Sequence, residues 1–420
     1  MTTNTTDTEI AALLAENDRR NEVMFAKFDP ITGEGSIGER VRVCISDFAV
    51  PVQWLPIEMM DIPFVKKLVK AGSIDNFLSS VLHVEPNPTD HTKVSRALIR
   101  LRFKHDFPFW TATLVYIHNK DAGKDVLFRL WYPQRILVSR FEEKRKAGLP
   151  IRLILLKARQ WGGSTTTQLY MAWLQFFHKK GLNSLIIAHQ GTASDEIKDM
   201  FDNMIKNYPV EFLHKMGETY SEDEPKLVGV GKSGSTHRVP QRGCKIKVGT
   251  AERPNGCRGG AYSLVHLSEV GLWQKTDGKS PEDIVRSACS GILARPYTMI
   301  VMESTANGTG NFFHREYSAA ADPEVESQFE ALFIAWFQIE HYSLPFASAD
   351  ELRAFAKKLW ENRGNAYTPS NREEPGRYLW SLWEKGASLE AIHWYVYERA
   401  GKNDFAVMAA EFPSDDTEAF

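Results

Sequence analysis

The stretch LILLKARQWGGSTTTQLYMAWLQFF, residues 153–177, decides the fold. Its first four residues are apolar and predict a buried strand. Beyond the glycines and hydroxyl residues, apolar side chains recur with helical spacing at Leu169, Ala172, Trp173, Phe176 and Phe177. A strand, a glycine turn and a helix in this order are typical of a phosphate-binding loop. The usual pattern has a lysine directly before the hydroxyl residue, whereas here Gly163 precedes Ser164.

Such a loop needs a turn without side-chain bulk, a helix N-terminus that faces the anion, a cation, and a hydroxyl for magnesium. The two glycines supply the turn, and Ser164 or Thr165 supplies the hydroxyl. The cation can come only from Lys157 or Arg159, at the start of the loop. A purely structural Gly-Gly turn beside a solvated lysine and arginine would give the same letters, so the loop needs support from elsewhere in the sequence.

Length and composition limit the class of protein. The 420 residues suggest two or three domains, and 43% hydrophobic residues allow a large core. The four cysteines form no C-x-x-C pair, which indicates neither a zinc site nor a disulfide framework. A net charge of −2 excludes an overall polycation. Any nucleic-acid surface must be local, and the basic stretches are RFEEKRKAG (140–148) and QRGCKIKVGTAER (241–253).

Strands and helices alternate from the quoted stretch onward. We expect strands at 151–156, 184–189, 262–270, 297–304 and 330–337, and helices from 165, over 194–205 and from Ser280. This alternation predicts a mostly parallel sheet with helices on both faces.

The flanking segments give weaker signals. We expect residues 1–20 to be disordered at first and then weakly helical, and 107–133 to form a β-hairpin. The tail from about residue 348 predicts helices, while 23–106 shows a mixed pattern that assigns no structure.

Two of the expected strands end in polar residues suited to nucleotide chemistry. Ser268 and Glu269 lie near the end of the expected strand 262–270, and the carboxylate could activate a water for attack on phosphate. Ser268 stands where an aspartate is usual, so it could hold magnesium only through a water. Ser304 and Thr305 end the next strand, in a corner that could sense a γ-phosphate.

A glutamine, Gln134, precedes the first core strand and could pair with the adenine edge. Each of these features also has a plain structural explanation: an exposed helix glutamine, a strand with a polar end, or an Asn-Gly turn. Their order along the chain (glutamine, glycine loop, acidic strand end, polar corner) is what favours nucleotide hydrolysis.

Together these motifs resemble the large terminase subunit of tailed bacteriophages and prophages, over roughly residues 128–420. The matching segments are LLKARQWGGST, CRGG (257–260), HLSEVGLW, ESTANGTGNFF and EFPSDDTEAF. The resemblance implies an α/β fold of the P-loop NTPase class (RecA-like, ASCE), a three-layer α/β/α sandwich with a mostly parallel sheet. It also implies an N-terminal extension (1–125), an ATPase core (126–345) and a helical subdomain that links towards an absent nuclease (346–420).

The resemblance also implies roles for individual residues. The ATP-binding residues would be Gln134, Arg159, Gln160, Trp161, Gly162, Gly163, Ser164 and Thr165, with Lys157 as a second phosphate cation. Glu269 would activate water. The coupling residues would be Ser304, Thr305 and Asn307; the metal ligands would be Ser164 and Glu269, with Ser268 acting through water. We favour Arg159 slightly over Lys157 because a guanidinium fork suits phosphate. Arg258 is a candidate arginine finger, and Arg140 or Arg253 could serve equally well.

The implied activity is that of an ATP-hydrolysing motor that moves double-stranded DNA into a procapsid, with ATP and Mg²⁺ as cofactors. Its expected partners are double-stranded DNA, further copies of itself in a ring-like homo-oligomer, the small terminase subunit and the portal protein, with no membrane. Its expected place is the cytoplasm of the infected bacterial host, transiently at the procapsid vertex. Family members usually continue with an RNase H-like nuclease. The chain stops at Phe420, so we expect no nuclease activity and a fragment or a split gene product.

Two other classes of function remain open. One is another P-loop DNA translocase or helicase-like ATPase, although the chain has no room for a second ATPase core. The other is a non-catalytic nucleotide-binding assembly module, which would not need the carboxylate of Glu269.

Overall fold

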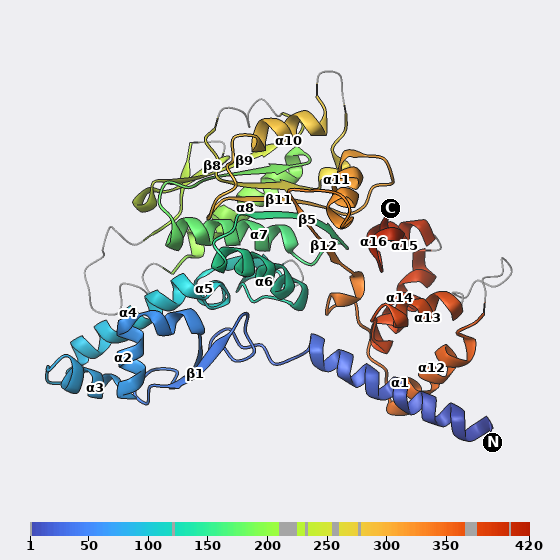
Figure 1. Ribbon diagram of the computed structural model, residues 1–420, viewed down its shortest axis with the longest axis horizontal. Coiled ribbons are helices and arrows are strands. Elements are labelled where there is room, and N and C mark those ends of the chain that lie inside the picture. Colours follow the sequence, from blue (N-terminus) through green and yellow to red (C-terminus); the bar gives the residue numbers. More distant parts are fainter. Residues whose placement is uncertain are drawn as a thin grey trace.

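An eight-stranded sheet forms the centre of the computed structural model, which describes residues 2–119, 122–209, 225–231, 234–253, 260–275, 279–365, 376–402 and 405–420 (Figure 1). Its strands, in spatial order, are β12 (Glu330–Ile334), β5 (Ile151–Lys157), β11 (Met299–Ser304), β10 (Leu264–Ser268), β6 (Asn183–Ala188), β9 (Cys244–Thr250), β8 (Thr236–Val239) and β7 (Val228–Val230). The first six pair in parallel and the last two add an antiparallel edge. The predicted mostly parallel sheet is confirmed.

Helices cover both faces of this sheet, as Figure 1 shows. One face packs against α6 (Tyr132–Lys146), α7 (Gly163–Trp173) with its following π-helical turn (Leu174–His178), and α8 (Gly191–Asn207). The other face packs against α10 (Pro281–Cys289) and α11 (Phe312–Ala321). Side chains alternate between the faces along each strand. In β10, for example, Leu264 joins the core under α7 and Val265 joins the core under α10. The expected three-layer sandwich is confirmed.

The order of the strands decides where polar residues meet. β11 lies between β5 and β10, and all three run in parallel. In this register Glu303 of β11 lies opposite Ser268 of β10 on one side and opposite Leu155 of β5 on the other. The carboxyl ends of the three strands therefore form one edge, where ligands bind in open α/β sheets.

The N-terminal part contains a helix and a small separate core. Helix α1 spans Thr2–Met24, which corrects the prediction that this segment begins disordered. The core is built from β1 (Arg40–Cys44), β2 (Val52–Pro56), α2 (Pro63–Ala71), α3 (Ile74–Asn76) and α4 (Pro88–His105). Helix α1 is not part of this core and lies against the C-terminal helices. There the side chain of Asn17 accepts a hydrogen bond from Leu389 N at 2.7 Å and donates to the carboxylate of Glu390.

The predicted hairpin over 107–133 is only partly right. Residues Phe107–Leu114 form helix α5, and the hairpin is confined to β3 (Tyr116–Asn119) and β4 (Lys124–Leu127). The physical reason is a helix cap. Asp106 accepts a hydrogen bond from Phe109 N, and Pro108 occupies the first turn, where its missing N–H costs nothing.

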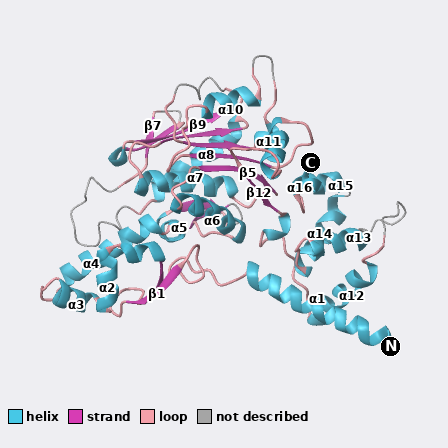
Figure 2. Ribbon diagram, in the orientation of Figure 1, coloured by secondary structure: helices cyan, strands magenta, loops and turns pink. Residues whose placement is uncertain are grey.

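The tail is helical, as predicted: α12 (Ala349–Asn362), α13 (Gly376–Glu384), α14 (Leu389–Lys402), α15 (Phe405–Glu411) and α16 (Asp416–Ala419) (Figure 2). The last residue returns to the sheet, where the ring of Phe420 lies 6.4 Å from Phe313 and 6.0 Å from Tyr317 on α11. Among the described helices, none is long and apolar enough to cross a membrane.

Parts of both basic stretches take part in the packing and ion pairs of the fold. Cys244–Thr250 is strand β9, whose Ile246 and Val248 are buried and which pairs with strands on both sides. In the other stretch, Arg145 pairs with Glu142 at 2.8 Å, and Lys144 pairs with Glu330 at 2.8 Å. The buried side chains of β9 and the ion pairs of Lys144 and Arg145 therefore contribute to the fold.

Candidate functional site

A buried lysine lies at the carboxyl edge of the sheet. Lys157, the last residue of β5, places its Nζ 2.7 Å from Oε1 of Glu269 and 3.0 Å from Oε2 of Glu303. Its side chain is only 7% exposed. Burial alone would lower the pKa of Lys157, but the two carboxylates outweigh burial and raise the pKa above its ordinary value. The ammonium group therefore stays charged.

Glu303 is a site residue that sequence reasoning missed. It is fully buried on β11, and its Oε1 accepts hydrogen bonds from the hydroxyls of Ser164 at 2.6 Å and Ser268 at 2.7 Å. Burial would raise the pKa of Glu303, but the charge of Lys157, with His266 and Ser164, holds it well below its usual range. A signal was present in the sequence: a carboxylate inside the apolar run of 297–304.

Glu269 lies at the tip of β10 in an uncommon backbone conformation. Its φ of 53° is in the left-handed region, which non-glycine residues rarely adopt. Oε2 of Glu269 accepts a hydrogen bond from Thr305 N at 3.1 Å, while Oε1 faces Lys157. Backbone conformations of this kind persist where the surrounding structure imposes them, and they concentrate at functional sites.

The predicted acidic strand end and polar corner are in direct contact. Ser304 accepts a hydrogen bond from Gly271 N at 3.0 Å, and Asn307 donates to Gly271 O at 2.9 Å. A Cβ at Gly271 would lie 2.8 Å from Oγ of Ser304, so this approach requires glycine. Ser304, Thr305 and Asn307 therefore all hold the turn that carries Glu269.

At Gly163, where a lysine is usual, the glycine loop has no room for a side chain. A Cβ on Gly163 would lie 2.7 Å from the buried indole of Trp161, and one on Gly162 would lie 2.7 Å from Nε2 of Gln134. Gln160 and Gly162 both have positive φ, of 60° and 74°. The indole of Trp161 thus fills the space that a side chain at position 163 would enter.

The loop leaves the N-terminus of α7 without a side-chain cap. Gly162 is the N-cap, and the hydroxyls of Thr166 and Thr167 bond back to the carbonyls of Gly162 and Gly163. Thr165 is half-buried in the first turn. Uncapped N–H groups at a helix start form a natural anion site.

Gln134 braces this loop. Its Nε2 donates to Trp161 O at 2.8 Å, and its Oε1 accepts from Trp131 N at 2.9 Å. The side chain is buried, and each end of the amide has a backbone partner. The adenine contact of Gln134 stays a prediction.

The two candidate cations have different surroundings. Arg159 pairs with Glu411 at 2.6 Å, and its side chain is 51% exposed. The backbone of Arg159 is held too, because its N donates to Glu411 O and its O accepts from Tyr342. The structure brings Lys157 to Glu269 and Arg159 to Glu411; which of the two binds phosphate stays a prediction.

The arginine-finger candidates stay predictions. Arg258 lies outside the described residues. Arg253 is exposed beyond β9, and Arg140 pairs with Glu143 at 3.0 Å on the outside of α6.

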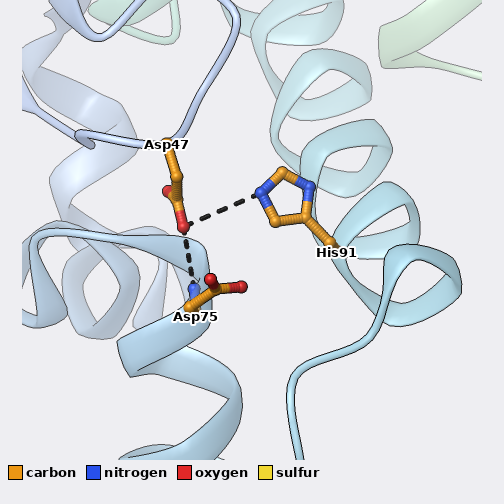
Figure 3. Close-up of side chains that lie close together, drawn as sticks. All are labelled: Asp47, Asp75 and His91. Carbon is orange, nitrogen blue, oxygen red and sulfur yellow. Dashed lines mark hydrogen bonds and ion pairs between the residues drawn. The ribbon is translucent and has the colours of Figure 1, made fainter.

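The donor set fits a magnesium ion. Ser164, Ser268, Glu269 and Glu303 offer hydroxyl and carboxylate oxygens, the hard ligands that Mg²⁺ prefers. A second group, Asp47, Asp75 and His91, lies in the N-terminal part (Figure 3). There the two oxygens of Asp47 accept hydrogen bonds from Ile74 N and Asp75 N in the first turn of α3, and His91 lies 3.7 Å from Asp47.

Comparisons with known proteins concern the fold. No family model and no curated protein matches the sequence. A variant of the large terminase ATPase domain of Thermus phage P74-26 is similar, with a TM-score of 0.34 and 15% identity over 55% of this chain and 88% of that chain. The bacteriophage HK97 large terminase is similar with a TM-score of 0.41 and 12% identity, over 64% of this chain and 51% of that chain. The Phi-28 gp11 DNA packaging motor is similar with a TM-score of 0.28 and 12% identity, over 56% and 65%.

Proposed function

We propose that this chain is the ATP-hydrolysing motor of a phage terminase large subunit and moves double-stranded DNA into a procapsid. The observation that carries the proposal is the meeting of Lys157, Glu269 and the Ser304–Asn307 corner at the carboxyl ends of three adjacent parallel strands. Beside them lies the uncapped start of α7. A cation, a carboxylate and a helix N-terminus are the parts that phosphoryl transfer to water requires.

Each part has a definite task in this proposal. The N–H groups of the first turn of α7 and the ammonium of Lys157 bind the phosphates. Glu269 orients a water and accepts its proton as the water oxygen bonds to the γ-phosphorus and the bond to the β-phosphate oxygen breaks. Ser164 and Glu269, with Ser268 through a water, would hold a magnesium ion, which neutralises phosphate charge when bound.

Lys157 also controls Glu269. The structure shows its ammonium on the carboxylate, at 2.7 Å. A γ-phosphate at the start of α7 competes for that ammonium, so nucleotide binding frees one oxygen of Glu269 to face water. The base is thereby released only when its substrate is present.

The polar corner gives a route from hydrolysis to movement. Oε2 of Glu269 is held by Thr305 N, and the corner leads directly into α11, on which Phe420 of the tail packs. A change at Glu269 on loss of phosphate therefore shifts β11, α11 and the end of the helical tail. In this proposal 126–345 is the ATPase core, 1–125 the N-terminal extension and 346–420 the subdomain that relays movement.

The partners follow from the proposed motor. DNA contact is with phosphates, falls with salt and shows no sequence preference, because a packaging motor moves along any sequence. The chain works as a ring-like homo-oligomer with the small terminase subunit and the portal protein, in the host cytoplasm at the procapsid vertex. A neighbouring copy supplies an arginine, for which Arg258 is our candidate.

The test is Glu269→Gln. We expect DNA-stimulated ATP hydrolysis to fall by about 10²–10⁴-fold, the range for a lost general base, while nucleotide affinity is kept. Glu282→Gln, a paired surface carboxylate on α10, is the matched control and should leave hydrolysis unchanged. Undiminished hydrolysis in Glu269→Gln would contradict the role of this residue.

Two outcomes would favour the alternatives. Strand separation by the wild-type chain, without movement along intact duplex, would indicate a helicase-like ATPase. Nucleotide binding without hydrolysis, with DNA present, would indicate a non-catalytic assembly module.

A further inference from the structure

Strand β10 carries a serine at position 268, and the buried carboxylate of Glu303 lies beside it on the neighbouring strand β11. Ser268 stands where the resemblance described above leads us to expect an aspartate. Its register partner on β11 is Glu303. We propose that Glu303 is a positioning residue that supplies, from the neighbouring strand, the negative charge and hydroxyl orientation by which the site holds its divalent cation. This inference rests on the proposed nucleotide site.

The first support is the direction of two hydroxyl groups. A serine hydroxyl has a single hydrogen, and both Ser164 and Ser268 donate theirs to the same oxygen, Oε1 of Glu303, at 2.6 and 2.7 Å. Donation to a carboxylate leaves the lone pairs of each hydroxyl oxygen available to a cation or its waters. Glu303 therefore turns two neutral hydroxyls, one from the loop helix and one from β10, into aligned ligands.

The second support is charge. Glu269 and Glu303 face a single ammonium, that of Lys157, so this group of three side chains carries an excess of one negative charge. Without Glu303, Lys157 and Glu269 would form a neutral pair. A buried excess of negative charge next to hydroxyl oxygens is suited to a divalent cation.

The third support is how Glu303 is held. Behind it lies His266, whose Nε2 is 3.5 Å from Oε1 of Glu303 and whose Nδ1 is 3.4 Å from Nε2 of Gln168. All three side chains are buried. Positions 266 and 268 lie two apart on a strand and 164 and 168 lie four apart on a helix, so each pair lies on one face. Outer residues of this kind fix the orientation of metal ligands.

The first experiment is Glu303→Gln, which keeps the shape of the side chain and removes its charge. ATP binding is measured with a fluorescent ATP analogue, once in EDTA and once across a Mg²⁺ titration. We expect the Mg²⁺ concentration for half-saturation to rise about 10–100-fold, the usual cost of losing an outer residue at a metal site, while binding in EDTA changes little. Glu282→Gln is the control and should match the wild type.

A merely structural role predicts a different pattern, because a distorted loop would weaken binding in EDTA and in Mg²⁺ alike. An unchanged Mg²⁺ requirement, or an equal loss in both conditions, would overturn the role of Glu303. If the wild-type chain itself binds no ATP analogue with Mg²⁺, the proposed function fails instead. The two failures are thus distinguishable.

The second experiment is a rescue. Ser268→Asp in the Glu303→Gln background returns the carboxylate to β10, and we expect the Mg²⁺ half-saturation to come back to within a few-fold of wild type. Ser268→Asp alone should give no such gain, because it places two carboxylates opposite each other. Failure of the double variant to recover any Mg²⁺ affinity would contradict transfer of the charge between strands.

Should Glu303→Gln not fold, Ser268→Ala carries the same test. It removes one of the two oriented hydroxyls while Glu303 keeps its contacts with Lys157 and Ser164. We expect the Mg²⁺ half-saturation to rise several-fold with binding in EDTA unchanged. No change in either measurement would overturn the proposal.

Discussion

Two cations only two residues apart, at the end of β5, have opposite surroundings. Lys157 is 7% exposed and held by Glu269 and Glu303, a group we call the inner contact. Arg159 is 51% exposed and held by Glu411, which we call the outer contact. Closeness in sequence therefore says little about role. The inner contact joins three strands of the sheet, whereas the outer contact joins the loop to α15.

Burial decides what each contact contributes. An exposed ion pair gains little free energy, since water screens it and its long side chains lose freedom. A buried pair is different, because removing one partner leaves the other charged without compensation in a medium of low dielectric. The comparison predicts large effects at Lys157 and small ones at Arg159.

The largest effect is expected for Lys157→Met, which keeps the length of the side chain and removes its charge. Glu303 then stays fully buried without its ammonium partner. We expect a loss of about 3–5 kcal/mol in the free energy of unfolding, together with loss of ATP hydrolysis. Urea unfolding measures the first and phosphate release the second. A loss below about 1 kcal/mol, the range of exposed pairs, would break the comparison.

The pH dependence of stability gives a second test of the inner contact. The pKa of Glu303 is lowered in the folded chain, so its stabilising contribution is present above its ordinary value of 4.5 and is lost as pH falls through the folded pKa. The raised pKa of Lys157 keeps its contribution present below 10.5, with loss only at higher pH. In Lys157→Met the largest of the effects that lower the pKa of Glu303 is lost, while His266 and Ser164 still oppose the burial that raises it.

Protonation of Glu303 in that variant therefore begins at a higher pH and relieves the unpaired charge. We expect the difference in unfolding free energy between wild type and Lys157→Met to be largest near neutral pH and to shrink below 4.5. Urea unfolding at several pH values measures it. A difference that stays constant with pH would show that lost packing, and not lost charge, causes the defect.

The contrast between core and edge also explains what the sequence could predict. Buried parallel strands such as 151–156 are continuous apolar runs, so they were recognised. Strand β9 is not predicted, because its half-buried lysines alternate with the buried Ile246 and Val248, so that the stretch resembles a basic patch. Glu303 was missed because sequence shows a polar strand end, whereas only strand order shows that it lies between β5 and β10.

The sequence also does not predict which way the side chains of Lys157 and Arg159 point. Which way Arg159 points depends on Glu411, a partner 252 residues away, and on the path of the tail. Helix α5 is not predicted, because the aromatic and β-branched residues after Asp106 favour a strand. The hydrogen bond from Phe109 N to Asp106 caps the helix that forms instead. Local patterns predicted elements, and long-range contacts decided which side chains share a site.

A middle-sized effect is expected for Gly163→Ala. The added Cβ would lie 2.7 Å from the indole of Trp161, so the ring must shift in a packed loop. We expect a loss of about 1–3 kcal/mol, typical of overpacking. Gly364→Ala is the control, because a Cβ there meets nothing within 4 Å. Thermal unfolding of both variants measures the difference, and equal behaviour would show that Trp161 moves freely.

The same glycine tests whether the inner cation can be moved to its usual place. In the double variant Lys157→Met with Gly163→Lys, the new side chain starts against the indole. We therefore expect no recovery of ATP hydrolysis. Recovery would mean that the loop accepts a cation from either position.

The smallest effect is expected for Arg159→Ala. Its partner Glu411 is itself 30% exposed, so water can solvate the carboxylate that remains. We expect a change of at most about 1 kcal/mol in unfolding free energy and ATP hydrolysis within a few-fold of wild type. Glu411→Gln should behave alike, because it removes the same pair from the other side. If Arg159→Ala instead abolishes hydrolysis while Lys157→Met retains it, the guanidinium leaves Glu411 to bind phosphate. Lys157 then only stabilises the strand ends, and the roles of the inner and outer contacts are reversed.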